Sequence, residues 1–452
     1  MDRLLQRFPF GLVVPIAIAG TIVAFAAGSS SVAGALTVGR PLRWIALVVL
    51  LVAAAGWAIS RRNEASLRLS VLAAAAAFLA VALESTLWSV DSRLTFEKAA
   101  SLVLLLVVAA ALAIATAGRR WALQRVLLGV VGGAAAVAAV GLLLLAVDHG
   151  AAVEAATLDL PARYRGFGQN PNTVSLLLAL CLPIAVWFAL RAGSRREAAL
   201  ALAGAVFFDG SIVASASRAA LIAGFAGVFV VVALASGSIR FRLVCAGVTV
   251  VVLVVSVVIA LAPKSKGEAT ATTPTAPAAS AGHKPKPKPR YVNVDTVFPL
   301  SFDIGEPLPG QLNPTHRTLL GLSGRGEAWR GALDEADARP ALGYGFGTEG
   351  RVFVDRYVNF AADLPESSYV GLYLQLGAIG LLAFLALVAA LALSAVRGMA
   401  LGDAAVVLAV LVVALLIAVT QSYVYSVGNI GTATAWICAF LGAGLTVRRA
   451  AT

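Results

Sequence analysis

Arginines at the edges of long apolar stretches are the residues of this chain best suited to do chemistry. Arg218 stands between two apolar segments, and Arg325 begins a polar stretch with helical spacing. The planar guanidinium group binds phosphate oxygens through two parallel hydrogen bonds and stays charged at any relevant pH. A charge inside a membrane segment costs about 2.5 to 3.5 kcal/mol on insertion scales and usually has a function. We therefore predict that Arg218 and Arg325 are catalytic residues that bind a phosphate group.

Structural explanations for these two arginines stay open. Arg218 could extend from the end of a span toward the interface. Asp209, about two helical turns earlier, could form a structural ion pair with it. Arg325 could be solvated at the start of its helix, or could pair with Glu327 or Asp334.

A second pair of arginines, Arg163 and Arg165, follows the fifth apolar stretch. We predict that both bind substrate, for the same chemical reason. The alternative is that they lie on the surface of a loop and bind nothing.

The composition places these residues in a membrane protein. Hydrophobic residues make up 60% of the chain and charged residues 13%, and the mean hydropathy is +0.89, so polar side chains could not cover a soluble surface. A helical span needs about 20 apolar residues. The sequence predicts an all-α polytopic membrane protein with about twelve transmembrane helices, or ten or eleven full spans if Asp209 and Arg218 interrupt the pattern. The candidates lie near residues 9–28, 42–60, 68–90, 96–117, 122–147, 172–191, 197–214, 219–236, 243–262, 368–395, 404–422 and 428–447.

The positions of the arginines also predict the orientation. If the N-terminus is cytoplasmic, the cytoplasmic segments carry clusters such as Arg61–Arg62 and Arg119–Arg120, and the outer loops carry fewer. This is the positive-inside bias. Both termini are then cytoplasmic and the long polar loop is extracytoplasmic. The net charge of +12 is a topology signal, so no nucleic-acid partner is expected.

Composition divides the chain into four regions. Residues 1–262 form an N-terminal membrane region with about nine transmembrane helices, and residues 368–452 form a C-terminal membrane region with about three. Between them, residues 263–290 are rich in Ala, Thr, Pro and Lys, which predicts a disordered spacer. Residues 291–367 regain aromatic and aliphatic side chains and are expected to be an ordered extracytoplasmic loop. Its glycines 343, 345 and 347 predict a tight turn.

Four short motifs occur in order along the chain. They are Leu87-Trp88-Ser89-Val90-Asp91, the stretch 163–172 with the sequence RYRGFGQNPN, Ser217-Arg218, and the stretch 325–347 with its spaced Arg, Trp, Pro and Gly residues. Together they resemble the O-antigen ligase and O-antigen polymerase superfamily, which are polytopic undecaprenyl-diphosphate-dependent glycosyltransferases. Each motif alone is weak, and their combination is fairly specific.

The resemblance implies a fold similar to C-type glycosyltransferases, with a large extracytoplasmic loop between helices 9 and 10. It implies a cytoplasmic (inner) membrane location, an undecaprenyl-diphosphate-linked glycan as donor, and an acceptor sugar or glycolipid. Arg218 and Arg325 would then hold the departing diphosphate, and Asn170 and Asn172 would bind substrate. We expect no cofactor. Since the chain lacks a DxD-type carboxylate pair that could bridge diphosphate oxygens through a divalent ion, we expect a metal-independent reaction.

Glu366 marks a departure from the family pattern. Ligases of the family carry a histidine at the start of the span that follows the long loop, where this chain has Glu366. We predict that Glu366 is the catalytic general base for the acceptor hydroxyl, unless it caps the first turn of the next helix. On that helix Tyr369 and Gln375 are predicted to bind substrate in a sugar groove, or else to pack between helices. The departure favours a polymerase, or a ligase-like transferase with an acceptor other than lipid A.

Two other functions stay open. A lipid-linked oligosaccharide flippase or exporter would also need arginines within the membrane, but it should show internal repeats and a charged cavity at the bilayer midplane. The chain has no convincing repeat. A non-catalytic scaffold for envelope assembly is the third possibility.

Overall fold

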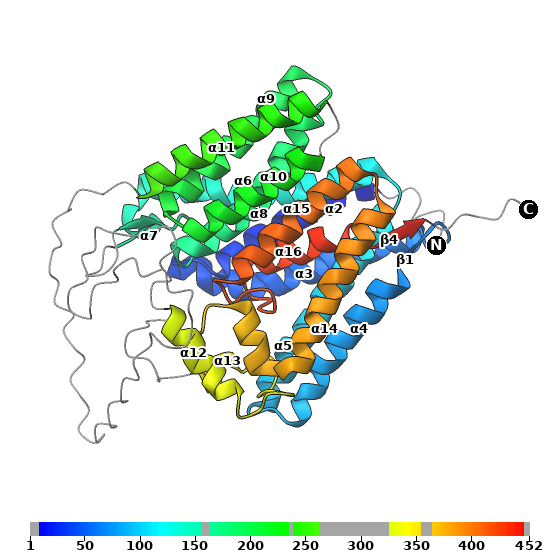
Figure 1. Ribbon diagram of the computed structural model, residues 1–452, viewed down its shortest axis with the longest axis vertical. Coiled ribbons are helices and arrows are strands. Elements are labelled where there is room, and N and C mark those ends of the chain that lie inside the picture. The colour runs from blue at the N-terminus through cyan, green and yellow to red at the C-terminus, as the bar shows by residue number, and fades with distance from the viewer. Residues whose placement is uncertain (1–8, 156–161, 235–237, 262–324, 354–363, 447–452) are drawn as a thin grey trace, which may run out of the picture.

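The computed structural model describes residues 9–155, 162–234, 238–261, 325–353 and 364–446. In these residues, ten helices are long and apolar enough to cross a membrane. Two shorter apolar helices, α10 (Arg218–Leu234) and α16 (Ile430–Phe440), pack among them. The predicted all-α polytopic class is confirmed (Figure 1). The ten are α2 (Phe10–Ala27), α3 (Ala33–Ser60), α4 (Leu69–Glu84) with the 3₁₀ turn η1 (Ser85–Leu87), α5 (Ser92–Thr116), α6 (Arg120–Val147), α8 (Pro171–Leu190), α9 (Arg195–Ser215), α11 (Ile239–Leu261), α14 (Ser368–Gly398) and α15 (Leu401–Ala418).

The helices differ in how deeply they are buried within the bundle. The apolar window of α8 is 78% buried and that of α15 is 67% buried, whereas α11 reaches only 11%. Helices α8, α10, α15 and α16 pack against one another and form the centre. The exposed apolar side chains of α11, such as Val251 and Ile259, suit contact with lipid. Small residues allow close approach elsewhere: a Cβ on Gly129 of α6 would lie 2.6 Å from the Pro15 carbonyl oxygen of α2.

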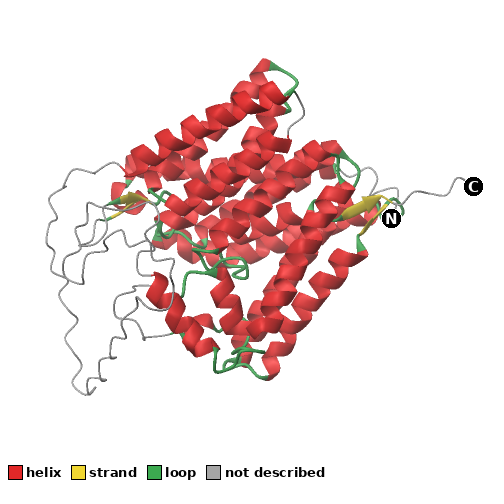
Figure 2. Ribbon diagram, in the orientation of Figure 1, coloured by secondary structure: helices red, strands yellow, loops and turns green. Residues whose placement is uncertain are grey.

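Consecutive helices run in opposite directions, so the connections gather at two ends of the bundle. At one end, β1 (Ala65–Leu67) pairs antiparallel with β4 (Gly444–Thr446). At the opposite end, β2 (Val153–Glu154) pairs with β3 (Arg163–Tyr164), as Figure 2 shows. The short helices α7 (His149–Ala152), α12 (Arg325–Ala336) and α13 (Glu349–Val352) lie at this second end, which we call the α12 end.

Two helices differ from the predicted spans. Helix α3 begins at Ala33 rather than near residue 42, so its first turns, which carry Arg40 and Pro41, precede the apolar part. Helix α16 ends at Phe440, although the last span was expected to reach residue 447. There the chain leaves the helix and pairs with β1, with Gly444 opposite Leu67.

Helix α14 is broken in its first third. Gly377 has φ 61° and ψ −163°, a conformation that side chains larger than glycine rarely adopt. The segment 340–345 satisfies the backbone groups that the break leaves open: Tyr344 N donates to Leu374 O at 3.1 Å, Gly345 N to Gln375 O at 2.8 Å, and Ala378 N to Pro340 O at 2.8 Å. The loop before α14 is thus hydrogen-bonded to the backbone of the helix.

The described part of the predicted loop, residues 325–353 and 364–367, holds α12 and α13 and then leads into α14. The glycines 343, 345 and 347 all have positive φ, which confirms the tight turn predicted there. The predicted spacer 263–290 and the stretch 291–324 lie outside the described residues.

Candidate functional site

Arg218 is placed at the α12 end of the bundle by a two-residue turn between α9 and α10. Ala216 in this turn has φ 51°, an uncommon conformation for a residue with a side chain. The turn makes Arg218 the first residue of α10. Backbone N–H groups at a helix N-terminus favour anions, so the guanidinium and the helix end act in the same direction.

Three of the predicted arginines come together here. The positive charges of Arg325 and Arg163 both act on the Arg218 guanidinium. Arg325 begins α12 and Arg163 lies in β3, so three separate segments contribute. Like charges repel, and a group of arginines of this kind suits an anionic ligand with several oxygens.

Glu366 lies directly beside this cluster. Its carboxylate forms an ion pair with Arg325, and the two side chains are 28% and 17% exposed. Glu366 has φ 50°, which is strained for a residue other than glycine. Ser367 occupies the N-cap position of α14 and accepts a hydrogen bond from Val370 N at 3.5 Å. Glu366 therefore stands just outside the helix, next to an arginine, and Ser367 holds the capping position.

The hairpin of β2 and β3 holds Arg163 and Arg165 in different environments. Arg163 is buried, and its Nη2 donates to Glu154 Oε2 at 2.6 Å across the hairpin. Arg165 donates from Nε to Ala151 O at 2.9 Å and from Nη2 to Gly150 O at 2.8 Å. Arg165 thus fastens the hairpin to the end of α7, while Arg163 reaches the cluster.

The two predicted asparagines lie at the start of α8. Asn170 is its N-cap, and its Oδ1 accepts hydrogen bonds from the backbone N–H groups of Asn172 and Thr173, each at 3.0 Å. Asn172 is partly buried in the first turn. Asn170 therefore stabilises the helix start, and the substrate-binding role of both asparagines stays a prediction.

Asp209 does not act as the partner of Arg218 that the sequence allowed. Its Oδ2 accepts a hydrogen bond from Ser256 Oγ of α11 at 2.8 Å. Asp209 therefore joins α9 to α11 inside the membrane segment rather than neutralising the arginine cluster.

Tyr369 and Gln375 are both engaged within the protein. The Tyr369 hydroxyl donates to Leu415 O of α15 at 3.0 Å, and its ring packs edge-on against Phe384. Gln375 is fully buried, and its Oε1 accepts a hydrogen bond from Gly347 N at 2.6 Å. These contacts are those of interhelical packing, so substrate binding by either residue stays a prediction.

A buried carboxyl group that the sequence analysis missed lies next to Gln375. Glu349 is 3% exposed, and three side chains donate to it: Tyr425 Oη at 2.5 Å, Ser422 Oγ at 2.7 Å and Gln375 Nε2 at 3.1 Å. Burial raises the pKa of the Glu349 carboxyl to about 7, against the opposing effect of the hydrogen bonds from Tyr425 and Ser422. We call these four residues the Glu349 network.

The Glu349 network contacts the turn that Gly343, Gly345 and Gly347 form, because Gly347 N donates to Gln375 Oε1. A Cβ on Gly371, in the first turns of α14, would lie 2.9 Å from Glu349 Oε1, so the carboxyl group lies close to the helix start that follows Glu366. The Trp88–Ser89 motif contacts the start of the same turn, because Trp88 Nε1 donates a hydrogen bond to Leu342 O at 3.0 Å. Glu349 lies two residues after the last of the three glycines, Gly347, and this position is the sequence signal that could have pointed to it.

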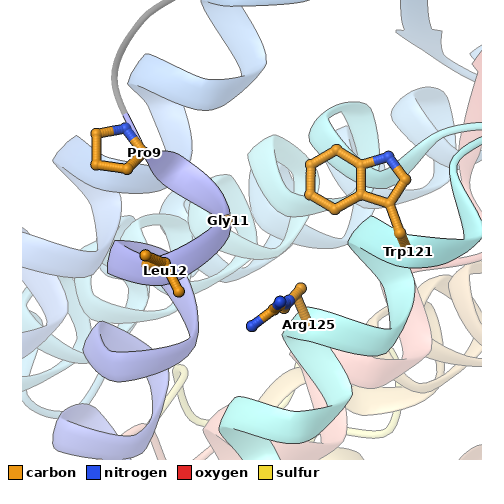
Figure 3. Close-up of a pocket in the computed structure, with 5 residues that line it drawn as sticks. All are labelled: Pro9, Gly11, Leu12, Trp121 and Arg125. Atoms are coloured by element: carbon orange, nitrogen blue, oxygen red, sulfur yellow. The ribbon is translucent and has the colours of Figure 1, made fainter.

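The opposite end of the bundle carries an open surface hollow. Figure 3 shows its lining residues: Pro9, Gly11 and Leu12 come from the start of α2, and Trp121 and Arg125 from the start of α6. Both helices begin at the end that holds β1 and β4, so this hollow is separate from the arginine cluster.

The fold and the site together define a polytopic helical membrane protein with a cationic, partly buried centre at one end of its bundle. Residues 202–385 match the family model described as O-antigen ligase. The resemblance that the motifs predicted is confirmed. A search of curated proteins finds no match to the chain.

The family match separates the candidate residues into two groups. Arg218, Arg325, Glu349 and Glu366 lie inside residues 202–385. Tyr369 and Gln375 also lie inside them, whereas the hairpin with Arg163 and Arg165 and the start of α8 with Asn170 and Asn172 lie outside. The domain supports a membrane glycosyltransferase-like role in the assembly of cell-surface polysaccharide.

Proposed function

We propose that the protein is an integral-membrane glycosyltransferase that transfers or polymerises a glycan from an undecaprenyl-diphosphate-linked donor onto an acceptor sugar or lipid. The observation that carries this proposal is the meeting of Arg218, Arg325 and Arg163 beside Glu366 at one end of the bundle. The O-antigen ligase match over two of these arginines and Glu366 supports the same reaction class.

In the proposed reaction, the acceptor hydroxyl oxygen attacks the anomeric carbon of the donor, and its proton passes to the Glu366 carboxylate. The bond between that carbon and the diphosphate oxygen breaks, and the lipid diphosphate leaves with the bonding electrons. Arg218 and Arg325 donate hydrogen bonds to its oxygens and stabilise the charge that develops. Aligned donors of this kind are worth most where water is excluded.

The ion pair of Arg325 with Glu366 gives the donor a second role. While the pair is closed, the Glu366 carboxylate is engaged by the Arg325 guanidinium and is not available to the acceptor hydroxyl. A donor diphosphate that binds Arg325 competes with Glu366 for the guanidinium and releases the carboxylate for the acceptor. The strained backbone of Glu366 (φ 50°) fits a residue held in place for a reaction.

The α12 end is proposed to face outward from the cytoplasmic (inner) membrane, with both chain termini in the cytoplasm. The positive-inside bias supports this orientation. Nucleotide sugars are not expected on the outer face, so a lipid-linked donor fits the site. The alternative of a flippase or exporter draws its support from the Asp209–Ser256 pair within the membrane segments.

The test is to incubate purified protein in liposomes with a lipid-diphosphate-linked oligosaccharide and a candidate acceptor. We expect glycan transfer with release of lipid diphosphate; a product ladder indicates a polymerase, and one shifted product indicates a ligase. The matched control is Arg351→Lys, an arginine of α13 that is 65% exposed and pairs with Asp91, which should keep wild-type turnover. Movement of intact donor across the bilayer without transfer would instead support the flippase.

The reaction is also proposed to be metal-independent, because the arginines supply the positive charge that a divalent ion would otherwise provide. Turnover in excess chelator should equal turnover without it. Loss of activity in chelator that one added metal restores would overturn this part of the proposal.

A further inference from the structure

A second pair of cations lies at the α12 end, on different helices from the arginine cluster. Arg43 of α3 and Lys98 of α5 lie close enough for their charges to act on one another, and Arg40 adds a third positive charge one turn from Arg43. The arginines that act on Arg218 are Arg325 and Arg163. The two groups therefore come from different segments of the chain.

The counter-charge at this pair is small. Glu97 is the carboxylate that acts on Lys98, but its side chain is 57% exposed and its Oε1 accepts a hydrogen bond from Arg93 Nε at 3.0 Å. Among the described residues, Lys98 has no hydrogen bond or ion pair. Both side chains are partly buried, and two neighbouring cations of this kind repel each other unless an anion joins them.

Arg43 also keeps hydrogen-bonding capacity. Its Nη1 donates to Gly428 O at 3.5 Å, and its guanidinium lies 5.2 Å from the centre of the Trp44 ring. Its Nε is buried and, within the described part of the chain, has no hydrogen-bond partner. A buried donor without an acceptor is costly, so a ligand oxygen that accepts a hydrogen bond from Arg43 Nε would remove this cost.

Two glycines lie close to the side chains of Arg43 and Lys98. A Cβ on Gly347 would lie 2.6 Å from Cγ of Lys98, and a Cβ on Gly428 would lie 3.0 Å from Nη1 of Arg43. These glycines belong to the turn before α13 and to the loop before α16, which also carry Glu349 and Tyr425 of the Glu349 network. A ligand at Arg43 and Lys98 would therefore lie beside the segments that hold the Glu349 network.

We propose that Arg43 and Lys98 form a second anion site, which binds the phosphate group of a lipid other than the glycan donor. A guanidinium fork beside an ammonium group matches phosphate oxygens in geometry and charge. In the proposed glycosyltransferase this lipid is a phosphorylated acceptor, a step that rests on the proposed function; the binding site itself does not.

The experiment measures lipid binding apart from catalysis. Native mass spectrometry of purified protein is titrated with phosphatidylglycerol, phosphatidylcholine and inorganic phosphate. Wild type should retain phosphatidylglycerol, and the double variant Arg43→Gln/Lys98→Met should bind it at least about tenfold more weakly, since each lost hydrogen bond to a charged group is worth that factor or more. The control Arg351→Gln, at an arginine of α13 that is 65% exposed and pairs with Asp91, should bind as wild type does.

Further arms separate the possible sources and the possible failures. Competition by inorganic phosphate alone at equal concentration would mean a free-phosphate site and would overturn the lipid assignment. Lys98→Arg keeps the charge and should keep binding. Without anionic lipid, Lys98→Met should melt at a higher temperature than wild type, because the repulsion is gone. A lower melting temperature with unchanged lipid binding would make Lys98 purely structural and overturn the proposal.

The result is distinguishable from failure of the proposed function. Arg218→Lys should impair glycan transfer and leave phosphatidylglycerol binding unchanged. If no transfer occurs in any variant but the double variant loses lipid, the second site stands and the glycosyltransferase proposal falls. Equal lipid binding by wild type and the folded double variant would overturn the second site alone.

Discussion

The arginine cluster and the Glu349 network lie at the same end of the bundle, yet they are built in opposite ways. Arg218, Arg325 and Glu366 are partly exposed charged side chains at helix starts. Glu349 is almost fully buried, and its carboxyl group is held by three hydroxyl or amide donors with no basic residue among them. The first arrangement suits an incoming anion. The second suits the fixing of the loop against α14.

The difference between the two regions shows which charged groups are available to bind a ligand and which hold the fold together. A partly exposed cation can exchange its protein partner for a substrate, as Arg325 can exchange Glu366. A buried carboxyl with satisfied hydrogen bonds cannot do so without opening the core. Variants in the two regions should therefore separate cleanly: loss of turnover in the cluster, and loss of stability in the network.

The largest expected effect is in the cluster. Arg218→Lys and Arg325→Lys should each lower turnover by about 100-fold or more, because a lysine cannot replace the bidentate guanidinium and each lost transition-state donor is worth about that factor. Melting temperatures should stay near wild type. The measurement is glycan transfer in liposomes, and wild-type turnover in both variants would remove these arginines from the site.

Glu366→Gln should come next, with turnover about 100-fold lower, the lower range for loss of a general base. The amide cannot accept the proton, but it also carries no charge to compete with the donor diphosphate for Arg325, so donor binding should be unchanged or stronger. Transfer rate and donor affinity are measured on the same sample. An unaltered rate would mean that Glu366 has a positional role alone.

In the network, Glu349→Ala should lower stability rather than the rate of each folded molecule. It leaves the donors of Tyr425, Ser422 and Gln375 without their acceptor, a loss we put at about 4 kcal/mol. Thermal unfolding in detergent and transfer per folded protein are the two measurements. A stable variant with lost turnover would move Glu349 into the reaction site and end the contrast between the regions.

The pH dependence of stability should isolate the same carboxyl group. Burial raises the pKa of Glu349 from its ordinary value of 4.5 to about 7, so the folded state binds more protons than the unfolded state between these values. Its contribution of about 3 kcal/mol is full below pH 4.5 and is lost as the pH rises to about 7. Compared with Glu349→Gln, wild type should lose stability across this range. A constant difference between the two from pH 4.5 to 7 would contradict the raised pKa.

The smallest effect is expected at Asn170. Asn170→Ala should cost about 1 kcal/mol through loss of the N-cap of α8, and Asn170→Ser should restore most of it. Chemical unfolding measures the loss of stability, and the glycan-transfer assay measures the activity of the same variants. Restored stability without restored transfer would indicate that Asn170 also binds substrate.

The sequence predicted the parts of this protein that local composition controls. Apolar runs of sufficient length identified most of the helices, and Arg218, Arg325 and Glu366 were visible because charges beside apolar stretches are rare. Burial of Glu349 was not predictable, since its partners come from α14 and from the loop before α16, far away in sequence. The break at Gly377 was hidden for the same reason: one glycine in an apolar run has no local signature of the segment 340–345 that pairs with it.

The boundaries show the same limit. The early start of α3 places Arg40 and Pro41 inside a helix, which hydropathy alone does not favour. The end of α16 depends on pairing between β4 and β1, which begin about 380 residues apart in the chain. Long-range backbone pairing leaves little trace in a local pattern.

The measurement that tests the central claim most directly is the affinity of purified protein for undecaprenyl diphosphate and undecaprenyl monophosphate. If the arginine cluster holds a donor diphosphate, wild type should bind the diphosphate more tightly than the monophosphate, and Arg325→Lys should lose most of that preference while Arg351→Lys keeps it. Equal affinity of wild type for the two lipids, or an unchanged preference in Arg325→Lys and Arg218→Lys, would contradict the claim.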